Sequence, residues 1–275
     1  MSWRFAYRPK WIVRHLLVVL LVATMIAALF WQLSRLHQKR SYKALVQGRE
    51  QLAPEPVQQL LPPGVHLGDR RVGDELYRTA TATGTYEAGR TVTVENRTDT
   101  NDSPGAWVLT PLDLGGGRAV LVNRGFLGFD SAGKIVPPAP PQGTVTVTGL
   151  LFPTQTRGFF GAKDPKTGVL SVVARVDLAR IGQQVPGDLL PAYLQASASR
   201  PPEPPAVGSA ARLEVLGPPV LSEGPHLSYA VQWGIFSTIA TVGYALLLRK
   251  VAIQEANEEA SEEANEEARA AAERV

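Results

Sequence analysis

The sequence contains no cysteine among its 275 residues. This excludes disulfide bridges, thiolate metal sites, cysteine nucleophiles and covalent c-type haem attachment. Only four histidines are present, and no two of them have the spacing of zinc ligands. The glycine-flanked serine of hydrolases, the P-loop and the dinucleotide-binding glycine motif are missing as well. Nothing in the sequence argues for catalysis, and we expect a protein that is not an enzyme and holds no protein-only metal site.

Two long apolar segments lie near the two ends of the chain. Residues 16–33 form a run of 18 in which only Thr24 and Gln32 are polar. Residues 229–248 form a run of 20 without Lys, Arg, Asp or Glu. At about 1.5 Å per residue, two such helices measure roughly 27 and 30 Å, which is enough to cross the hydrocarbon core of a bilayer. Both segments are therefore predicted to span a membrane.

The first apolar segment is interpreted as a retained anchor rather than a cleaved signal peptide. It follows a basic N-terminal stretch, as a signal peptide would. However, it is longer than the apolar region of a usual signal peptide, and no small-x-small cleavage site comes after it. The bulky and basic stretch Trp31–Leu36 follows instead.

The residues bordering the second segment predict its orientation. Arg249 and Lys250 follow it directly, whereas no Lys or Arg occurs between Leu213 and Leu248. The positive-inside rule then places the C-terminus in the cytoplasm, and two spans place the N-terminus there too. The predicted organisation is a cytoplasmic N-terminus (1–14), a transmembrane helix (15–34), an extracytoplasmic domain (35–225), a second transmembrane helix (226–249) and an acidic cytoplasmic tail (250–275).

The region between the spans has the pattern of strands. Thr alternates with other residues along 77–86, and Asp113–Gly117 separates two β-rich runs, as in a hairpin. A phosphate-binding role for Gly115–Gly117 is the weaker alternative. Further strands are expected at 91–95, 106–112, 118–126, 144–152, 169–176 and 212–221, with a short helix capped by Asp177 and a proline-rich loop at 200–208. The predicted fold class is a membrane protein in which two transmembrane helices flank an extracytoplasmic, mainly antiparallel β or α+β domain.

The charge is divided unevenly along the chain. Residues 251–275 hold eight glutamates and two arginines, and the rest of the chain carries a net charge of +9. Many of the basic residues flank the apolar segments, so membrane anchoring explains them better than nucleic acid, and we expect no nucleic-acid partner. The tail is interpreted as a solvated, partly helical segment, with docking to a basic partner as the alternative.

Small residues form a stripe on each apolar segment. Ala23 and Ala27 are four residues apart on the first, and such residues let helices approach closely in lipid. The stripes predict either that the two spans pack together or that one packs on a helix of a partner. The stripe on the second segment comprises Ala230, Gly234, Thr238, Thr241 and Ala245.

His226 is the most informative titratable residue. It lies just before the second apolar run, at the predicted outer boundary of the membrane. A neutral imidazole at that depth could ligate a haem iron. The alternative is an interfacial histidine held by local hydrogen bonds.

Several strings of residues resemble one protein family. Residues 31–39 match W-Q-x-x-R-L-x-x-K directly after the first span, and residues 226–233 match H-x-x-Y-A-x-x-W at the start of the second. In the same order the chain carries Gly84-Thr85-Tyr86, Glu95–Arg97, Pro104–Leu112 and Val120–Phe126. Over about residues 28–250 the chain thereby resembles the Surfeit-locus-one family of cytochrome c oxidase biogenesis proteins. It departs at Leu29 and Phe126, where that family more often has Gly and Trp, and its acidic tail resembles extensions of some actinobacterial members.

The resemblance implies an assembly factor for an aa3-type cytochrome c oxidase in the cell membrane. It implies transient handling of haem a for oxidase subunit I, and partners within a respiratory chain that include a bc1–aa3-type supercomplex. Carried onto this sequence, the haem ligand falls on His226, with Tyr229 and Trp233 beside it. The residues that would contact partner helices are Trp31, Gln32, Arg35 and Gly234.

Two other functions stay open at this stage. The chain could be a permanent accessory subunit of the oxidase or of a supercomplex, without chemistry of its own. It could also be an envelope enzyme or sensor unrelated to respiration.

Overall fold

The computed structural model describes residues 3–99, 101–204 and 213–272. The chain divides into two compact units. One is a helical unit made of Met1–Lys43 and Leu221–Val275, and the other is a β unit made of Ala44–Val220.

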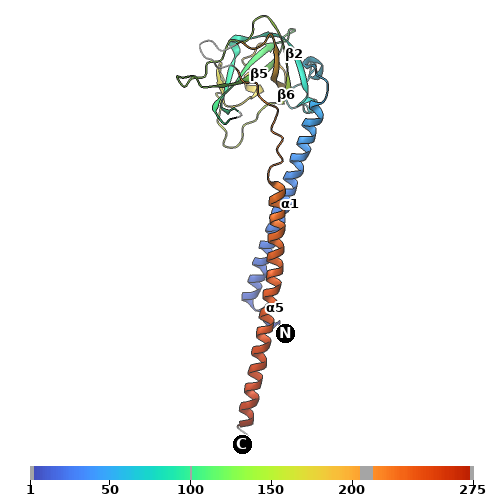
Figure 1. Ribbon diagram of the computed structural model, residues 1–275, viewed down its shortest axis with the longest axis vertical. Coiled ribbons are helices and arrows are strands. Elements are labelled where there is room, and N and C mark those ends of the chain that lie inside the picture. The colour runs from blue at the N-terminus through green and yellow to red at the C-terminus, as the bar shows by residue number, and fades with distance from the viewer. Residues whose placement is uncertain (1–2, 100, 205–212, 273–275) are drawn as a thin grey trace. The chain divides into compact units, whose positions relative to one another are not determined.

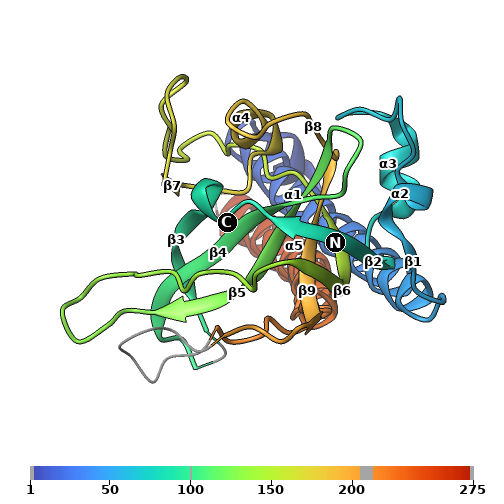
Figure 2. The ribbon, with the colours of Figure 1, turned by 90° about the horizontal axis from the view of Figure 1, so that it is seen from above.

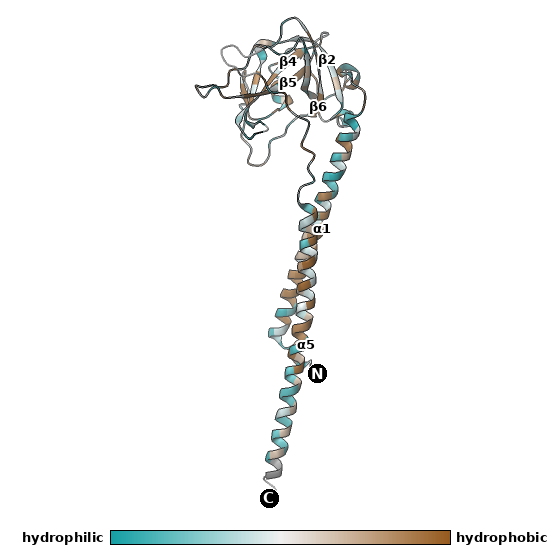
Figure 3. Ribbon diagram, in the orientation of Figure 1, coloured by the Kyte–Doolittle hydropathy of each residue, from teal (hydrophilic) through white to brown (hydrophobic). Residues whose placement is uncertain are grey.

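The helical unit consists of two long helices and a short helical turn. The turn η1 spans Arg4–Tyr7, α1 spans Pro9–Glu50 and α5 spans His226–Ala272. Both long helices are long and apolar enough to cross a membrane, and in each only 6% of the most apolar window is buried. Figure 3 shows that the apolar residues lie along the middle of the pair. Because so little of these windows is buried, their side chains are exposed, as in helices solvated by lipid.

The two long helices run antiparallel, side by side (Figure 1). The less exposed positions repeat at alternating steps of three and four residues, which is the spacing of a coiled-coil seam. On α1 these positions are Trp11, His15, Val18, Val22, Met25, Leu29, Gln32 and Leu36, and on α5 they are His226, Ala230, Trp233, Ser237, Ala240 and Tyr244.

The prediction that the spans pack together is thus supported, but the expected stripes do not form the contact. Ala23 and Ala27 of α1 are exposed, as are Thr238, Thr241 and Ala245 of α5. Only the start of the α5 stripe reaches the seam, through Ala230 and Gly234. On α5 the reason is the spacing: Ala230, Gly234 and Thr238 repeat every four residues and so drift away from a seam that repeats every 3.5 residues on average.

The β unit is built on one sheet with the strand order β1-β2-β6-β9-β5-β4-β3-β7 (Figure 2). β2 also pairs with β4, so the strands β2, β6, β9, β5 and β4 form a closed ring. The strands are β1 Glu55–Pro56, β2 Thr79–Tyr86, β3 Val92–Thr98, β4 Pro104–Asp113, β5 Arg118–Gly128, β6 Thr144–Pro153, β7 Val172–Val173, β8 Asp188–Leu189 and β9 Ala192–Arg200. The short helices are α2 Val57–Leu60, α3 Arg70–Glu75, η2 Ala88–Arg90 and α4 Leu178–Gly182.

Apolar side chains fill the space on both faces of the ring. Val120, Val122 and Leu194 belong to one buried cluster, which α2 and α3 help to cover. Ala119 and Leu121 point the other way, into a second cluster closed by α4. Because β5 is buried on both faces, its first half contains the unbroken apolar run Ala119–Val122 rather than an alternation.

Most of the predicted elements of the β unit are confirmed. β4 and β5 form the expected antiparallel hairpin, and Gly115–Gly117 make its turn with φ between +63° and +79°. Asp177 caps α4 by accepting a hydrogen bond from the backbone N–H of Arg180. Past Arg200 the proline-rich loop has no regular structure as far as residue 204, and 205–208 lie outside the described residues.

Two predicted strands are wrong, and the long strand β9 was not predicted, nor were the two-residue strands β1 and β8. Within 169–176 only the two residues of β7 pair, and from 213 to 221 a single bridge joins Glu214 to Phe126; residue 212 lies outside the described part. β9 was missed because it is rich in Ala and Ser, which have low strand propensity. Pairing with β6 and β5 on its two sides makes it a strand nonetheless.

Gly84 lets the ring close, because β2 approaches β4 there without room for a side chain. A Cβ atom on Gly84 would lie 1.9 Å from the carbonyl oxygen of Asp113. We expect Gly84→Ala to lower the free energy of unfolding by about 1–3 kcal/mol, measured as a lower midpoint in thermal unfolding of the solubilised protein. The matched control is Gly89→Ala, where a Cβ meets no atom within 4 Å. Equal midpoints for the two variants would contradict this role of Gly84.

Candidate functional site at the His226 end of the helical pair

A hydrogen bond between the two long helices fixes the ring of His226. Its Nδ1 lies 2.8 Å from Oε1 of Gln32, and Gln32 is only 9% exposed. Because a carbonyl oxygen accepts and does not donate, Nδ1 carries the proton. In the neutral ring the other nitrogen, Nε2, then carries the lone pair, which is the form of histidine that binds a metal.

The backbone before α5 lies directly beside that nitrogen at Gly224. Gly224 has φ +66°, and a Cβ on it would lie 3.5 Å from both Nε2 and Cδ2 of His226. Leu227 and Tyr229, which follow on α5, are 51% and 47% exposed. Leu227 and Tyr229 thus present exposed apolar surface next to His226 along α5.

An ion cluster holds the segment before His226 to α1. Glu223 accepts a hydrogen bond from Arg40 at 2.9 Å and lies 3.6 Å from Nζ of Lys43. The hydrogen bond from Arg40 lowers the pKa of Glu223, and both positive charges add to this effect. The cluster is therefore ionised at neutral pH and weakens only when acid protonates Glu223.

The structure brings together some of the predicted site residues and leaves others apart. Gln32 meets His226, whereas Trp31 is 58% exposed and Arg35 bonds only to Gln38 of its own helix. Trp233 lies one turn beyond Tyr229 and packs edge-to-face on Phe236 at 6.1 Å. A Cβ on Gly234 would lie 3.3 Å from Leu29 of α1, so this glycine faces the seam. The roles of these residues toward a haem or a partner stay predictions.

His15 forms a second bridge between the same helices but offers no free nitrogen. Its Nδ1 lies 2.6 Å from the hydroxyl of Tyr244, and its Nε2 donates to the carbonyl oxygen of Ala6 at 3.2 Å. This bridge was not predicted, because His15 and Tyr244 are 229 positions apart and share no motif. No group of three or more metal-binding side chains occurs in the part of the chain that the structure describes.

A buried cation in the β unit was also missed as a key residue. The guanidinium of Arg124 is fully buried and forms a double hydrogen bond with Glu203, at 3.1 Å from Nε and 2.5 Å from Nη2. It also donates to the backbone carbonyl of Pro138 at 2.9 Å and lies 5.6 Å from the ring of Tyr86. Burial raises the pKa of Tyr86, which keeps its hydroxyl neutral. All polar contacts of Arg124 are with the protein itself, so the cluster is structural.

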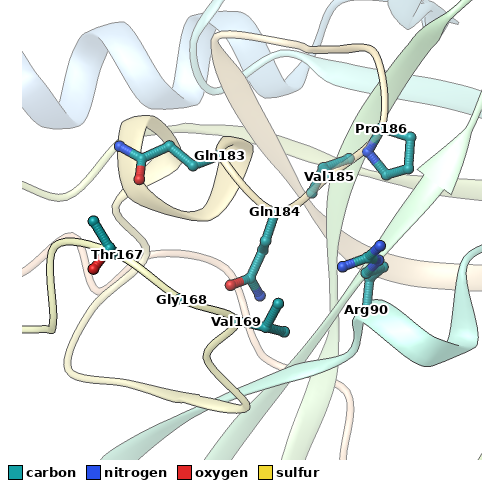
Figure 4. A pocket seen from close by; sticks show the side chains of 8 residues that line it. All are labelled: Arg90, Thr167, Gly168, Val169, Gln183, Gln184, Val185 and Pro186. Carbon is teal, nitrogen blue, oxygen red and sulfur yellow. The ribbon is translucent and has the colours of Figure 1, made fainter.

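A cavity of about 570 Å³ in the β unit is lined mainly by uncharged residues (Figure 4). Neither a carboxylate nor a histidine is among its lining residues, and Arg90 is the one charged group among them. The amide of Gln184 bonds at both ends to the backbone of Leu170, at 2.8 and 2.9 Å, and so braces the wall.

Comparison with known proteins gives a consistent result along most of the chain. The model of a family described as the SURF1 family matches residues 19–238. Uncharacterised SURF1-like proteins of Mycobacterium bovis and Mycobacterium tuberculosis are 31% identical over 246 residues, which cover 87% of this chain and 83% of theirs. A SURF1-like protein of Rickettsia felis is 25% identical over 245 residues, covering 86% of this chain and 97% of the relative.

Proposed function

The chain belongs to the SURF1 family, and we propose that it assists the assembly of an aa3-type cytochrome c oxidase from within the cell membrane. Both helices cross the bilayer in this proposal, with the two termini in the cytoplasm and the β unit outside it. The observation that carries the proposal is the hydrogen bond between His226 and Gln32. It joins the two strings that resemble the family most specifically, one on each helix.

The residues at this end of the pair fit a haem, so we propose haem a as the group that the protein handles for oxidase subunit I. His226 would hold the iron through Nε2, and haem a would supply the redox centre that subunit I needs. Gln32 keeps the proton on Nδ1 and so sets the ring orientation. The exposed side chains of Leu227 and Tyr229 provide the apolar surface that a macrocycle requires. The chain acts here by binding and orienting, so this function needs no enzymatic step.

A second function is favoured by the exposed stripe of small residues. Ala23, Ala27 and Thr238 are exposed although the helices pack along another face. Helices of a partner could approach closely at such positions. In a permanent accessory subunit of the oxidase, or of a bc1–aa3-type supercomplex, these small residues and Trp31 would pack against helices of the partner.

Stoichiometry separates the two functions. The full-length protein is tagged, the oxidase is purified through its own subunit, and the amounts of both are determined by quantitative mass spectrometry. We expect the protein at well below one copy per mature oxidase, with enrichment in preparations that lack complete haem. One copy per mature oxidase would overturn the assembly proposal in favour of the accessory subunit.

Gln32 provides a sharper test of the site, because it acts through His226. Gln32→Leu removes the acceptor and leaves the histidine in place, so we expect haem affinity to fall by about 10–100-fold. The measurement is haem titration of the purified protein followed by absorbance. The control is Gln38→Leu, since Gln38 is exposed and bonds to Arg35. Unchanged affinity in Gln32→Leu would contradict the orienting role.

A further inference from the structure

Two adjacent phenylalanines stand out from the β unit. Phe159 and Phe160 lie in the connection between β6 and β7, and they are 88% and 95% exposed. Their rings pack edge-to-face with centroids 4.8 Å apart, so each covers little of the other. Exposing two neighbouring aromatic side chains to water is costly, and such a patch marks a surface that something else covers.

The loop that carries these rings is anchored in its conformation. A tight turn, closed by a hydrogen bond from Gly161 N–H to the Gly158 carbonyl oxygen at 3.0 Å, presents them. Behind the turn, Arg175 donates to the carbonyl oxygen of Ala162, and Arg180 donates to those of Pro165 and Gly168 at 2.6 and 2.7 Å. The backbone therefore holds the two rings out instead of folding them onto the domain.

Positive charge surrounds the two rings. Arg157, Lys163 and Lys166 are exposed and flank them in sequence. Asp164, the single acid among residues 157–166, is turned inward: it accepts from the Ala174 N–H at 2.8 Å and pairs with Arg175 at 3.4 Å. The loop thus combines exposed aromatic rings with three exposed cations. These cations line one pocket together with two carboxylates and two further arginines, so positive charge is in excess there.

We propose that this loop inserts Phe159 and Phe160 into the headgroup region of an anionic bilayer, the one that the two helices of the chain cross. Aromatic rings favour the boundary between headgroups and acyl chains, and the neighbouring Lys and Arg bind anionic headgroups at the same depth. Because helices that enter the membrane precede and follow the β unit, the loop meets lipid at a high effective concentration. An acidic surface of a partner protein is the rival occupant. It accounts less well for two rings that are almost fully exposed and pack edge-to-face on each other.

A spin label beside the rings measures their surroundings directly. The chain has no cysteine, so Gly158→Cys gives a single labelling site, and a Cβ there meets no atom within 4 Å. Gly89→Cys is the matched control, since it is equally open but has no exposed aromatic neighbour. The full-length protein is placed in nanodiscs of phosphatidylcholine alone or mixed equally with phosphatidylglycerol. Accessibility of the label to oxygen and to a water-soluble nickel complex is then compared.

We expect the label at 158 to favour oxygen over nickel in the anionic nanodiscs, and the label at 89 to favour nickel. Adding Phe159→Ser and Phe160→Ser should abolish the preference at 158, and Lys163→Gln with Lys166→Gln should abolish its dependence on anionic lipid. A label at 158 that stays aqueous in both nanodiscs overturns the proposal. A label protected only after a partner protein is added overturns it in favour of that partner. None of these readouts involves haem or oxidase, so they are independent of the proposed assembly function.

Discussion

Purified wild-type protein is expected to show haem a absorption when it comes from cells that make haem a, and purified His226→Ala protein is expected to lack it. The ring of His226 is the one imidazole between the described parts of α1 and α5 whose Nε2 has no hydrogen-bond partner. Alanine at this position removes the proposed ligand, and His15 cannot take over its role because both of its ring nitrogens are engaged. The measurement is the reduced-minus-oxidised spectrum at equal protein concentration.

Two control variants separate loss of the proposed ligand from other effects of the substitution. His37→Ala removes an exposed histidine of the same helix as Gln32 and should leave the spectrum unchanged. His15→Ala breaks the other bridge between the helices, so it shows what a weakened helical pair does without loss of the ligand. If His226→Ala keeps the haem of the wild-type protein, the assignment of the ligand is wrong.

Arg124→Leu is expected to destabilise the β unit by about 3–5 kcal/mol, the largest stability effect we predict. The substitution leaves the carboxylate of Glu203 without its partner, and Glu203 is largely buried, with 20% of its side chain exposed. It also removes a donor to the Pro138 carbonyl, which cannot bond to water in the interior. Chemical unfolding of the solubilised protein, followed by tryptophan fluorescence, measures the loss as a lower midpoint.

The double variant Arg124→Leu with Glu203→Leu separates charge from packing. Replacing both members of a buried ion pair by apolar residues avoids the unpaired charge, so part of the stability should return. A double variant that is less stable than Arg124→Leu would show that Glu203 is not the group left unsatisfied. Unaltered stability in the single variant would contradict the structural role of Arg124.

The elements that could be predicted from the sequence are those in which the local residue preferences favour the same structure as the tertiary contacts do. The hairpin of β4 and β5 has three glycines at its turn, and each has a positive φ that few other residues adopt. The two long helices follow from composition, because no globular core in a chain of this size needs such apolar runs. The predicted cap at Asp177 follows from its side-chain oxygen, which satisfies a free N–H of the first turn.

Long-range contacts could not be predicted in the same way. β9 is a strand because β6 and β5 pair with it, not because its alanines and serines favour strand. Gln32 and His226 were each predicted to be site residues, but their hydrogen bond was not predicted. It joins positions 194 apart in the sequence, and the antiparallel packing of the two helices brings them together. The polarity of Gln32 could not predict this pair, because a single Gln near the end of an apolar run is also typical of the boundary of a membrane span.

The haem a content of the oxidase itself tests the central claim most directly. The chromosomal copy of the protein is replaced by His226→Ala, and haem a is measured per copy of oxidase subunit I in the membranes. We predict less haem a per subunit I than in the wild type, with normal amounts of the variant protein in the membrane and normal values in a His37→Ala strain. Full haem a occupancy of subunit I in the His226→Ala strain would contradict the claim that this end of the helical pair serves oxidase assembly.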